Sequence, residues 1–457
     1  MYEKELITKM LRLDNKEIKI TKKIYDKLKI SIIDTLGVSL LGKKNLLYIK
    51  FYDFYNKNPQ NSLFSTSFIW GSKRKVSAID ATFLNTFAGH IEDFDNILYP
   101  TFGHPSVMLN PAMFSLYEYK ESDGKRFLDA LLIGIESMSY FGILFGEGLR
   151  NKKLHPTPII GSLGVIASLG NYLDFSLEEY ISGFNLVGTS FSGFQSSFGS
   201  ELKSFQVASS ASTALKAALY THEGIYNSIN YRFIDNLDLL SNSKGEKDEL
   251  IHMLTHSNSW ILEDEDFLYK KFPCCGYFQH VMEGVYGVYN NSGNSISAIK
   301  KISLILPEYI GEANKFELPA NTEEAKFSLK FNLALYLIYE DNYLGNFNYL
   351  SLKDEKVLNL MNQIDIEYKK NDLCVLENDI FGYVELHYYN DNVQIKNISL
   401  AKETNYSIES MIEEKFYHCA SNILNYKEIQ NILYLVKDFE NTNSEDWKKI
   451  QNDIFKK

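Results

Sequence analysis

Four short segments of this chain combine histidine, acidic, lysine or cysteine side chains in patterns that could do chemistry. The first runs from His90 through Asp93 to Asn96 and resumes at His104-Pro105-Ser106. A carboxylate beside an imidazole fixes its tautomer and raises its basicity, so this segment is a candidate acid–base site. The alternative is a helix C-terminus whose acidic side chains are solvated.

The next two segments place a titratable residue beside apolar or small residues. His155 comes directly before a segment that predicts a helix, and the free backbone N–H groups of a helix N-terminus favour an anion. Lys203 follows the Gly- and Ser-rich stretch 183–200, which we expect to be buried. A loop histidine and a solvated lysine are the alternatives.

The fourth segment is Lys270-Lys271-Phe272-Pro273-Cys274-Cys275, at an expected domain boundary. Clefts between domains are common ligand sites, and two lysines there could bind an anion. Adjacent cysteines more often pack than react. The chain has four cysteines and no C-x2-C pair, so we expect no metal site.

Charge and composition limit the partners. The 457 residues carry a net charge of −11, which argues against sequence-independent nucleic-acid binding. Any anion site must therefore gather positive charge locally. Scarce cysteines and a start without an apolar signal core favour a reducing, cytoplasmic location. The uncharged runs 154–173 and 181–200 are too polar for membrane spans and predict buried helices.

Periodicity predicts the elements that must position these segments. Apolar residues at helical spacing predict helices over a series of ranges, and Glu136 within one of them is expected to be a paired core carboxylate. An extended pattern predicts two strands and a hairpin turning near Asn390–Asn392. The helical ranges are 22–42, 76–92, 124–146, 158–173, 177–200, 205–222, 278–290, 321–340 and 406–457; the strands are 298–306 and 363–368, and the hairpin is 381–399.

A chain of this length exceeds a single hydrophobic core, so we expect two domains. The predicted fold is mainly α. A large all-α helical domain comprises 1–265 plus 401–457, and a smaller α+β domain, 266–400, is inserted into it.

In this order, the motifs resemble the MmgE/PrpD family, which includes 2-methylcitrate dehydratases and cis-aconitate decarboxylases. The similarity covers about residues 22–290 and rests on short segments in the correct order with plausible spacing. They are Asp34-Thr35-Leu36-Gly37, Asn85 to His90, Asp93-Phe94-Asp95-Asn96, His104-Pro105-Ser106, His155-Pro156, Lys203 and Lys270 to Cys275.

The resemblance implies a helical domain with an inserted α+β lid, a homodimer, a site between the domains, and catalysis without metal or organic cofactor. It also implies that Asp93, His104, His155, Lys203 and Lys270 line a substrate pocket. We expect His104 to be the acid–base group, with Asp93 orienting it. The two lysines would bind substrate carboxylates, and His155 would bind a carboxylate or act as a second acid–base group.

Several pocket positions depart from the family pattern. Ile97 replaces a threonine of the decarboxylases, Cys275 a histidine, and Phe331 a tyrosine of the lid helix. Gln206 replaces a histidine, and Ala208 a glycine. Because loss of hydrogen-bonding groups from a buried site changes which substrate it accepts, we expect a less polar substrate with fewer carboxylates.

The function indicated is a cofactor-independent lyase, a dehydratase or decarboxylase, that acts on a small carboxylic or polycarboxylic acid. An isomerase or epimerase is the first alternative, because the same proton-transfer groups can invert an α-carbon when nothing leaves. A non-catalytic binding or scaffold protein is the second. We expect a small-molecule carboxylate and a second copy of the chain as partners, with no nucleic acid or membrane.

Overall fold

The computed structural model describes residues 2–11, 19–57, 66–120, 122–225, 231–241, 259–340, 343–370, 380–399 and 407–454. The chain forms two compact units. The larger unit comprises Met1–Ser197, Leu202–Tyr269 and Ile408–Lys457, and the smaller comprises Phe198–Glu201 and Lys270–Ser407. We expected boundaries at 265/266 and 400/401; residues 401–406 lie outside the described residues.

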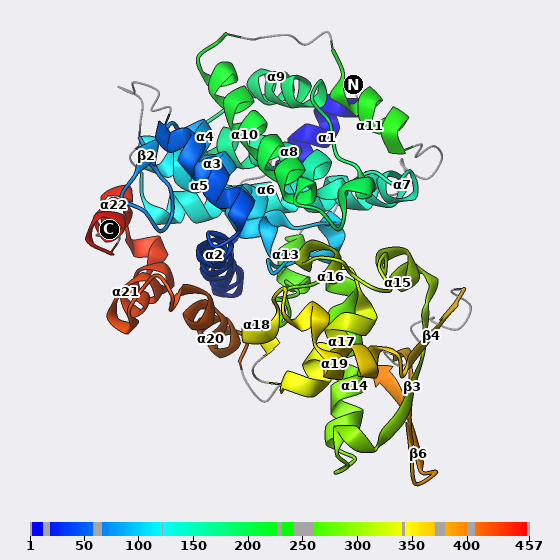
Figure 1. Ribbon diagram of the computed structural model, residues 1–457. Coiled ribbons are helices and arrows are strands. Elements are labelled where there is room, and N and C mark those ends of the chain that lie inside the picture. Colours follow the sequence, from blue (N-terminus) through cyan, green and yellow to red (C-terminus); the bar gives the residue numbers. More distant parts are fainter. Residues whose placement is uncertain are drawn as a thin grey trace. The chain divides into compact units, whose positions relative to one another are not determined.

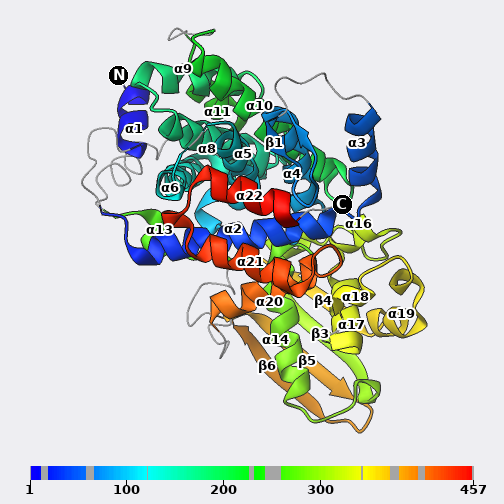
Figure 2. The same cartoon turned by 90° about the vertical axis from the view of Figure 1, so that its left-hand side faces the viewer.

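The larger unit is a set of helices in which the last part of the chain returns to the first (Figure 1). Helix α2 packs against α20 and α21, and Figure 2 shows this long helix beside the C-terminal helices. The helices are α1 (Tyr2–Met10), α2 (Lys22–Gly42), α3 (Leu46–Lys57), α4 (Ala78–Ile91), α5 (Pro105–Tyr119), α6 (Gly124–Phe141), α7 (Glu147–Asn151), α8 (Pro156–Tyr172), α9 (Leu177–Gly188), α10 (Leu202–His222), α11 (Phe233–Ser241), α13 (Ile261–Asp264), α20 (Ile408–Ala420), α21 (Tyr426–Lys437) and α22 (Ser444–Ile454). A two-residue pair, β1 (Ser67–Phe68) and β2 (Lys75–Val76), is antiparallel.

Small residues let the central helices approach closely. A Cβ on Gly134 of α6 would lie 3.0 Å from the carbonyl oxygen of Gly164 of α8, and the reverse distance is also 3.0 Å. Glu136, two residues after Gly134, is fully buried and accepts hydrogen bonds from the backbone N–H groups of Ile261 and Leu262. It satisfies donors at the start of α13, so the expected paired carboxylate is a helix-capping group.

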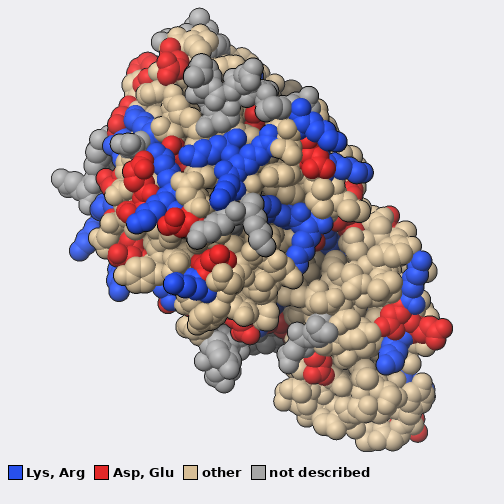
Figure 3. Space-filling model, turned by 60° about the vertical axis from the view of Figure 1, so that its left-hand side comes forward, with Lys and Arg blue, Asp and Glu red and all other residues tan. Residues whose placement is uncertain are grey.

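Among the described residues, one continuous helical stretch, 124–151, is long and apolar enough to cross a membrane. Its most apolar window is 89% buried inside the molecule, as in the core helix of a globular protein. On the face shown in Figure 3, basic and acidic side chains are interspersed over the larger unit, so the net charge of −11 does not gather there as one acidic surface.

The smaller unit packs helices on a four-stranded mixed sheet of order β4-β3-β5-β6. β3 and β4 are parallel, Ile302 lying opposite Ile364, whereas β5 is antiparallel to both β3 and β6. Helix α14 packs against β5, β6 and α17. The strands are β3 (Ile299–Pro307), β4 (Ile364–Lys369), β5 (Ile380–Tyr388) and β6 (Val393–Ser399), and the helices are α14 (Gln279–Asn290), α15 (Glu308–Ala313), α16 (Thr322–Ala325), α17 (Leu329–Tyr339), α18 (Tyr343–Asn346) and α19 (Glu355–Met361).

The mainly-α prediction is confirmed, but three expected helical ranges are shorter or divided. The range 406–457 contains the three helices α20, α21 and α22. The helix expected over 177–200 ends at Gly188, because residues beyond it form a loop in which Gly193 has a φ of +148°. The helix expected over 321–340 is two helices. Ser328 accepts a hydrogen bond from the Phe331 N–H, which starts α17 anew.

Candidate active site

His104 and His155 occupy the same kind of local position, immediately before a helix whose first residue is proline. Proline is tolerated at the first helical position and pushes the preceding residue out of the helical conformation. His104 has φ −112° and ψ 83°, and His155 has φ −95° and ψ 105°. Neither side chain caps its helix, so both imidazoles are available for other contacts.

Asp95 joins His104 to a third histidine, His90 in the last turn of α4. Asp95 Oδ2 lies 2.9 Å from His90 Nδ1 and 3.0 Å from His104 Nδ1. The ring centroids of His90 and His104 are 4.8 Å apart, and those of His90 and His155 are 6.3 Å apart. The carboxylate therefore hydrogen-bonds Nδ1 of His90 and lies at ion-pair distance from Nδ1 of His104, on the side of each ring opposite Nε2.

Burial sets the charge states of this cluster. It lowers the pKa of His90 to about 4, although Asp95 opposes that shift. It also lowers the pKa of His155 well below its usual value, with Lys203 adding to the effect. Burial alone would raise the pKa of Asp95, but His104 and His90 outweigh it and hold that pKa well below the usual range. Near neutral pH, Asp95 is ionised, whereas His90 and His155 are neutral.

Lys203 enters the cluster from the first turn of α10 and pairs with Asp93. Its Nζ lies 2.7 Å from Asp93 Oδ1, and both side chains are buried. Gln206, one turn further along α10, hydrogen-bonds the His155 side chain. Its side-chain oxygen also accepts a hydrogen bond from the Phe194 N–H of the preceding loop. The charges of Asp93, Asp95 and Lys203 leave one net negative charge when the histidines are neutral.

The orienting carboxylate differs from the expectation. We expected Asp93 to orient His104, but Asp95 makes that contact and Asp93 pairs with Lys203. The reason lies in the turn that ends α4, because Asp93 has a left-handed φ of +49° and its N–H bonds to the His90 carbonyl. This turn sends the two carboxylates toward different partners.

His90 and Asp95 lie within a motif that the sequence singles out, but the sequence alone predicts no separate role for either residue. Their separation of five residues, across a helix end, matches no regular helical contact. The sequence does contain a signal for them: the polar stretch that leads to His104 carries a second histidine and a second carboxylate.

The remaining expected site residues are divided between the units. Ile97 pairs its backbone with Leu268 through N–O distances of 3.0 and 2.8 Å, so its main chain holds the segment that leads to Lys270. Lys270, Cys275 and Phe331 belong to the smaller unit. There the Cys275 N–H bonds to a backbone carbonyl, and Phe331 packs edge-on against another ring of the core.

The cluster also includes a set of atoms that could bind a metal ion. Ligand atoms of His90, Asp95 and His104 lie within 4.8 Å of one another. Two imidazole nitrogens and a carboxylate suit a divalent transition metal. Asp95 already contacts both imidazoles, at 2.9 and 3.0 Å, so the approach of the three groups has an explanation without an ion.

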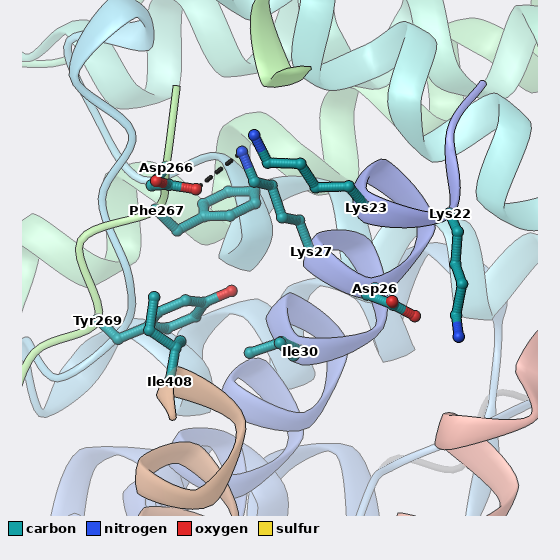
Figure 4. Close-up of a pocket in the computed structure, with 9 residues that line it drawn as sticks. All are labelled: Lys22, Lys23, Asp26, Lys27, Ile30, Asp266, Phe267, Tyr269 and Ile408. Atoms are coloured by element: carbon teal, nitrogen blue, oxygen red, sulfur yellow. Dashed lines mark ion pairs between the residues drawn. The ribbon is translucent and has the colours of Figure 1, made fainter. Parts of the chain in front are cut away.

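A separate cavity of about 420 Å³ lies at the start of α2, and none of the cluster residues lines it (Figure 4). Lys27 Nζ there contacts Asp266 at 2.7 Å and the carbonyls of Leu262 and Glu265. Lys23 Nζ bonds to another carbonyl of the same segment, that of Glu263. These lysines stabilise the chain just before Leu268, which is a structural role.

Chemically, the cluster provides the parts of a proton-transfer site. His104 is the least buried of the three imidazoles, 9% exposed against 0% for His90 and 2% for His155. A buried carboxylate against its Nδ1 stabilises the imidazolium that forms when Nε2 takes a proton. The fold and this cluster therefore define a two-unit, mainly helical protein with a carboxylate–imidazole centre suited to proton transfer.

The chain belongs to the MmgE/PrpD family. Residues 13–229 match the MmgE/PrpD N-terminal domain and residues 272–373 the MmgE/PrpD C-terminal domain. The chain is 22% identical to the cis-aconitate decarboxylase of Homo sapiens in an alignment of 444 positions that covers 92% of this chain and 88% of the relative. It is also 22% identical to the cis-aconitate decarboxylase of Mus musculus over 76% of this chain and 72% of that protein. Family and relatives support a lyase-type enzyme.

Proposed function

We propose that this protein is a cofactor-independent lyase that acts on a small carboxylic acid, with His104 as the proton-transfer group. The contact of Asp95 Oδ2 with His104 Nδ1 is the observation that carries the proposal. It leaves Nε2 to exchange a proton with substrate and stabilises the charge that results. His155 acts as a second acid–base group or binds a carboxylate.

The proton transfer fits two lyase reactions. In a decarboxylation, protonated His104 gives its proton to the far (γ) carbon of a β,γ-unsaturated acid, whose leaving carboxylate is on the carbon next to the alkene. The C–C bond then breaks, its electron pair restores an alkene, and CO2 leaves. In a dehydration, neutral His104 removes a proton α to a carboxylate, and the β-hydroxyl leaves as water after it gains a proton.

Substrate binding in this proposal is coupled to proton uptake. The cluster holds one net negative charge while its histidines are neutral, and Asp93 already neutralises Lys203. A carboxylate substrate is therefore bound better when His104 is protonated, and Lys270 is proposed as a second cation.

The experiment is proton NMR of the purified protein in D2O with cis-aconitate, citrate, 2-methylcitrate and iminodisuccinate-like acids. Deuterium in recovered substrate or in product supports proton transfer, and His104→Gln should abolish it. Loss of CO2 or water identifies the lyase. An inverted α-carbon without a leaving group would identify the isomerase alternative, and no exchange with any acid would favour a scaffold protein.

We further propose that the protein is a homodimer. Helix α10 exposes Leu202, Phe205 and Tyr220, which are 58%, 40% and 40% accessible, and such apolar side chains favour an interface. Light scattering during size-exclusion chromatography should give about twice the chain mass of 52.6 kDa. A single-chain mass would contradict the proposal.

A further inference from the structure

The turn that carries Asp93 and Asp95 packs against a buried ion pair between Asp34 and Lys415. Asp34 Oδ2 of α2 accepts hydrogen bonds from both the backbone N–H and the side-chain amide of Asn96, at 3.1 and 2.9 Å. Asn96 in turn accepts from the Ser106 hydroxyl at 2.8 Å. The turn is thereby tied to α2 on one side and to the first turn of α5, which follows His104, on the other.

Lys415 of α20 completes this network. Its Nζ lies 2.7 Å from Asp34 Oδ1, donates to the Phe94 carbonyl at 2.7 Å, and lies 3.9 Å from the centroid of the Phe94 ring. Asp34 is fully buried on its side chain and Lys415 nearly so. Phe94 is the residue between the two site carboxylates, so this ammonium fixes the peptide that separates them.

Helix packing brings Lys415 to this position. Gly37, one turn after Asp34, faces α20, and a Cβ there would lie 2.9 Å from Phe416 Cδ2. Only a residue without a side chain lets α20 approach α2 this closely. Phe416 and Ile412 are 1% exposed, so apolar burial holds α20 against α2 on both sides of the lysine.

We propose that Lys415 is a positioning residue for the candidate active site. Through Asp34 and the Phe94 carbonyl it sets the 93–96 turn so that Asp95 lies between His90 and His104. The residue lies beyond both segments that match the family domains, which end at residue 373. The C-terminal helices thus contribute to the site itself, an inference that rests on the proposed proton-transfer role of His104.

Lys29 provides a matched control. Like Lys415, it is a buried lysine that joins α2 to the C-terminal part of the chain. Lys29 is 7% exposed and Lys415 is 8% exposed. Its Nζ contacts Glu440 at 3.1 Å and the Lys437 carbonyl at 3.0 Å. Among the described residues none of its contacts reaches the 93–96 turn, so Lys29→Met removes an ion pair, one whose acidic partner is 32% exposed, without touching the site.

The test labels the nine histidines with 13C at Cε1 and compares Lys415→Met with Lys29→Met at a temperature where both are folded. Signals are assigned with His90→Gln and His104→Gln. We expect Lys415→Met to shift the His90 and His104 signals and to lower exchange of the best acid at least tenfold, mainly through kcat. Lys29→Met should leave the His90 and His104 signals unshifted and the exchange rate within twofold of the parent.

A second variant keeps the test decisive if Lys415→Met does not fold. Lys415→Met combined with Asp34→Asn removes both charges and leaves no buried carboxylate unpaired, yet it still releases the Phe94 carbonyl. We expect this double variant to fold with shifted histidine signals. Unshifted His90 and His104 signals in either Lys415 variant, or equal shifts in Lys29→Met, would overturn the inference. The histidine signals need no substrate, so a parent protein that exchanges no acid refutes the proposed function separately.

Discussion

Replacing His90 by glutamine should change how steeply the stability of the larger unit depends on pH. Burial lowers the pKa of His90 to about 4, whereas an unfolded histidine has a pKa near 6.5. Between these two values the unfolded chain binds a proton that the folded chain excludes. The contribution of His90 is therefore fully present above the unfolded pKa and is lost as the pH falls toward the folded pKa.

The magnitude follows from that pKa difference. Each pKa unit corresponds to about 1.4 kcal/mol, so a change from about pH 7 to about pH 5 should lower the free energy of unfolding by about 2 kcal/mol through His90 alone. His155, whose pKa burial and Lys203 also lower, should contribute in the same direction. His90→Gln lacks a titrating ring and should lose its share of the slope.

Tryptophan fluorescence during urea unfolding can measure this effect in the larger unit. The chain has three tryptophans, Trp70, Trp260 and Trp447, and all belong to that unit. Parent and His90→Gln are unfolded at several pH values, after treatment with a chelator so that no bound ion competes for the ring. For each protein the free energy of unfolding is plotted against pH, and the slopes of the two plots are compared. The comparison does not depend on how stable each protein is at neutral pH.

His155→Gln is the companion variant, and the two changes should each reduce the slope. An unchanged slope in His90→Gln, with the same denaturant dependence as the parent, would refute the assignment of His90 as a buried neutral imidazole. That result would also contradict the net negative charge of the cluster, on which the proposal of proton-coupled substrate binding is based.

The other predictions concern the site more directly. Asp95→Asn should lower exchange or turnover by about 100-fold or more, because it removes the carboxylate that stabilises a protonated His104; activity close to that of the parent excludes this role. Lys203→Met leaves the Asp93 carboxylate buried without its ion pair and should lower the unfolding free energy by about 3–5 kcal/mol, and adding Asp93→Asn should recover much of the loss in urea titrations. Removing metals with a chelator should leave activity unchanged; loss of activity with recovery on adding a divalent cation would instead assign a metal to the three ligand groups. Ile97→Thr restores a hydroxyl and should raise kcat/KM for cis-aconitate relative to acids with fewer carboxylates.

The sequence predicted the architecture well where periodicity is strong. The range 22–42 is the same as that of α2, and the strands expected over 298–306 and 363–368 differ from β3 and β4 by one residue at each end. Repeating apolar positions encode which face is buried, and this information is local. The helix expected over 177–200 failed because small polar residues have no period that separates a buried helix from a loop packed against one.

The site shows the same division. Residue types and order alone indicated a carboxylate–imidazole centre, with His104 and His155 each placed at a helix start by the proline that follows. They did not determine that Asp95 rather than Asp93 contacts His104, since a left-handed φ at one residue reverses which side each carboxylate faces. Nor did they connect Lys415 to the turn, because 319 residues separate Lys415 from Asn96. Contacts of that separation depend on how the helices pack, and only the tertiary structure decides them.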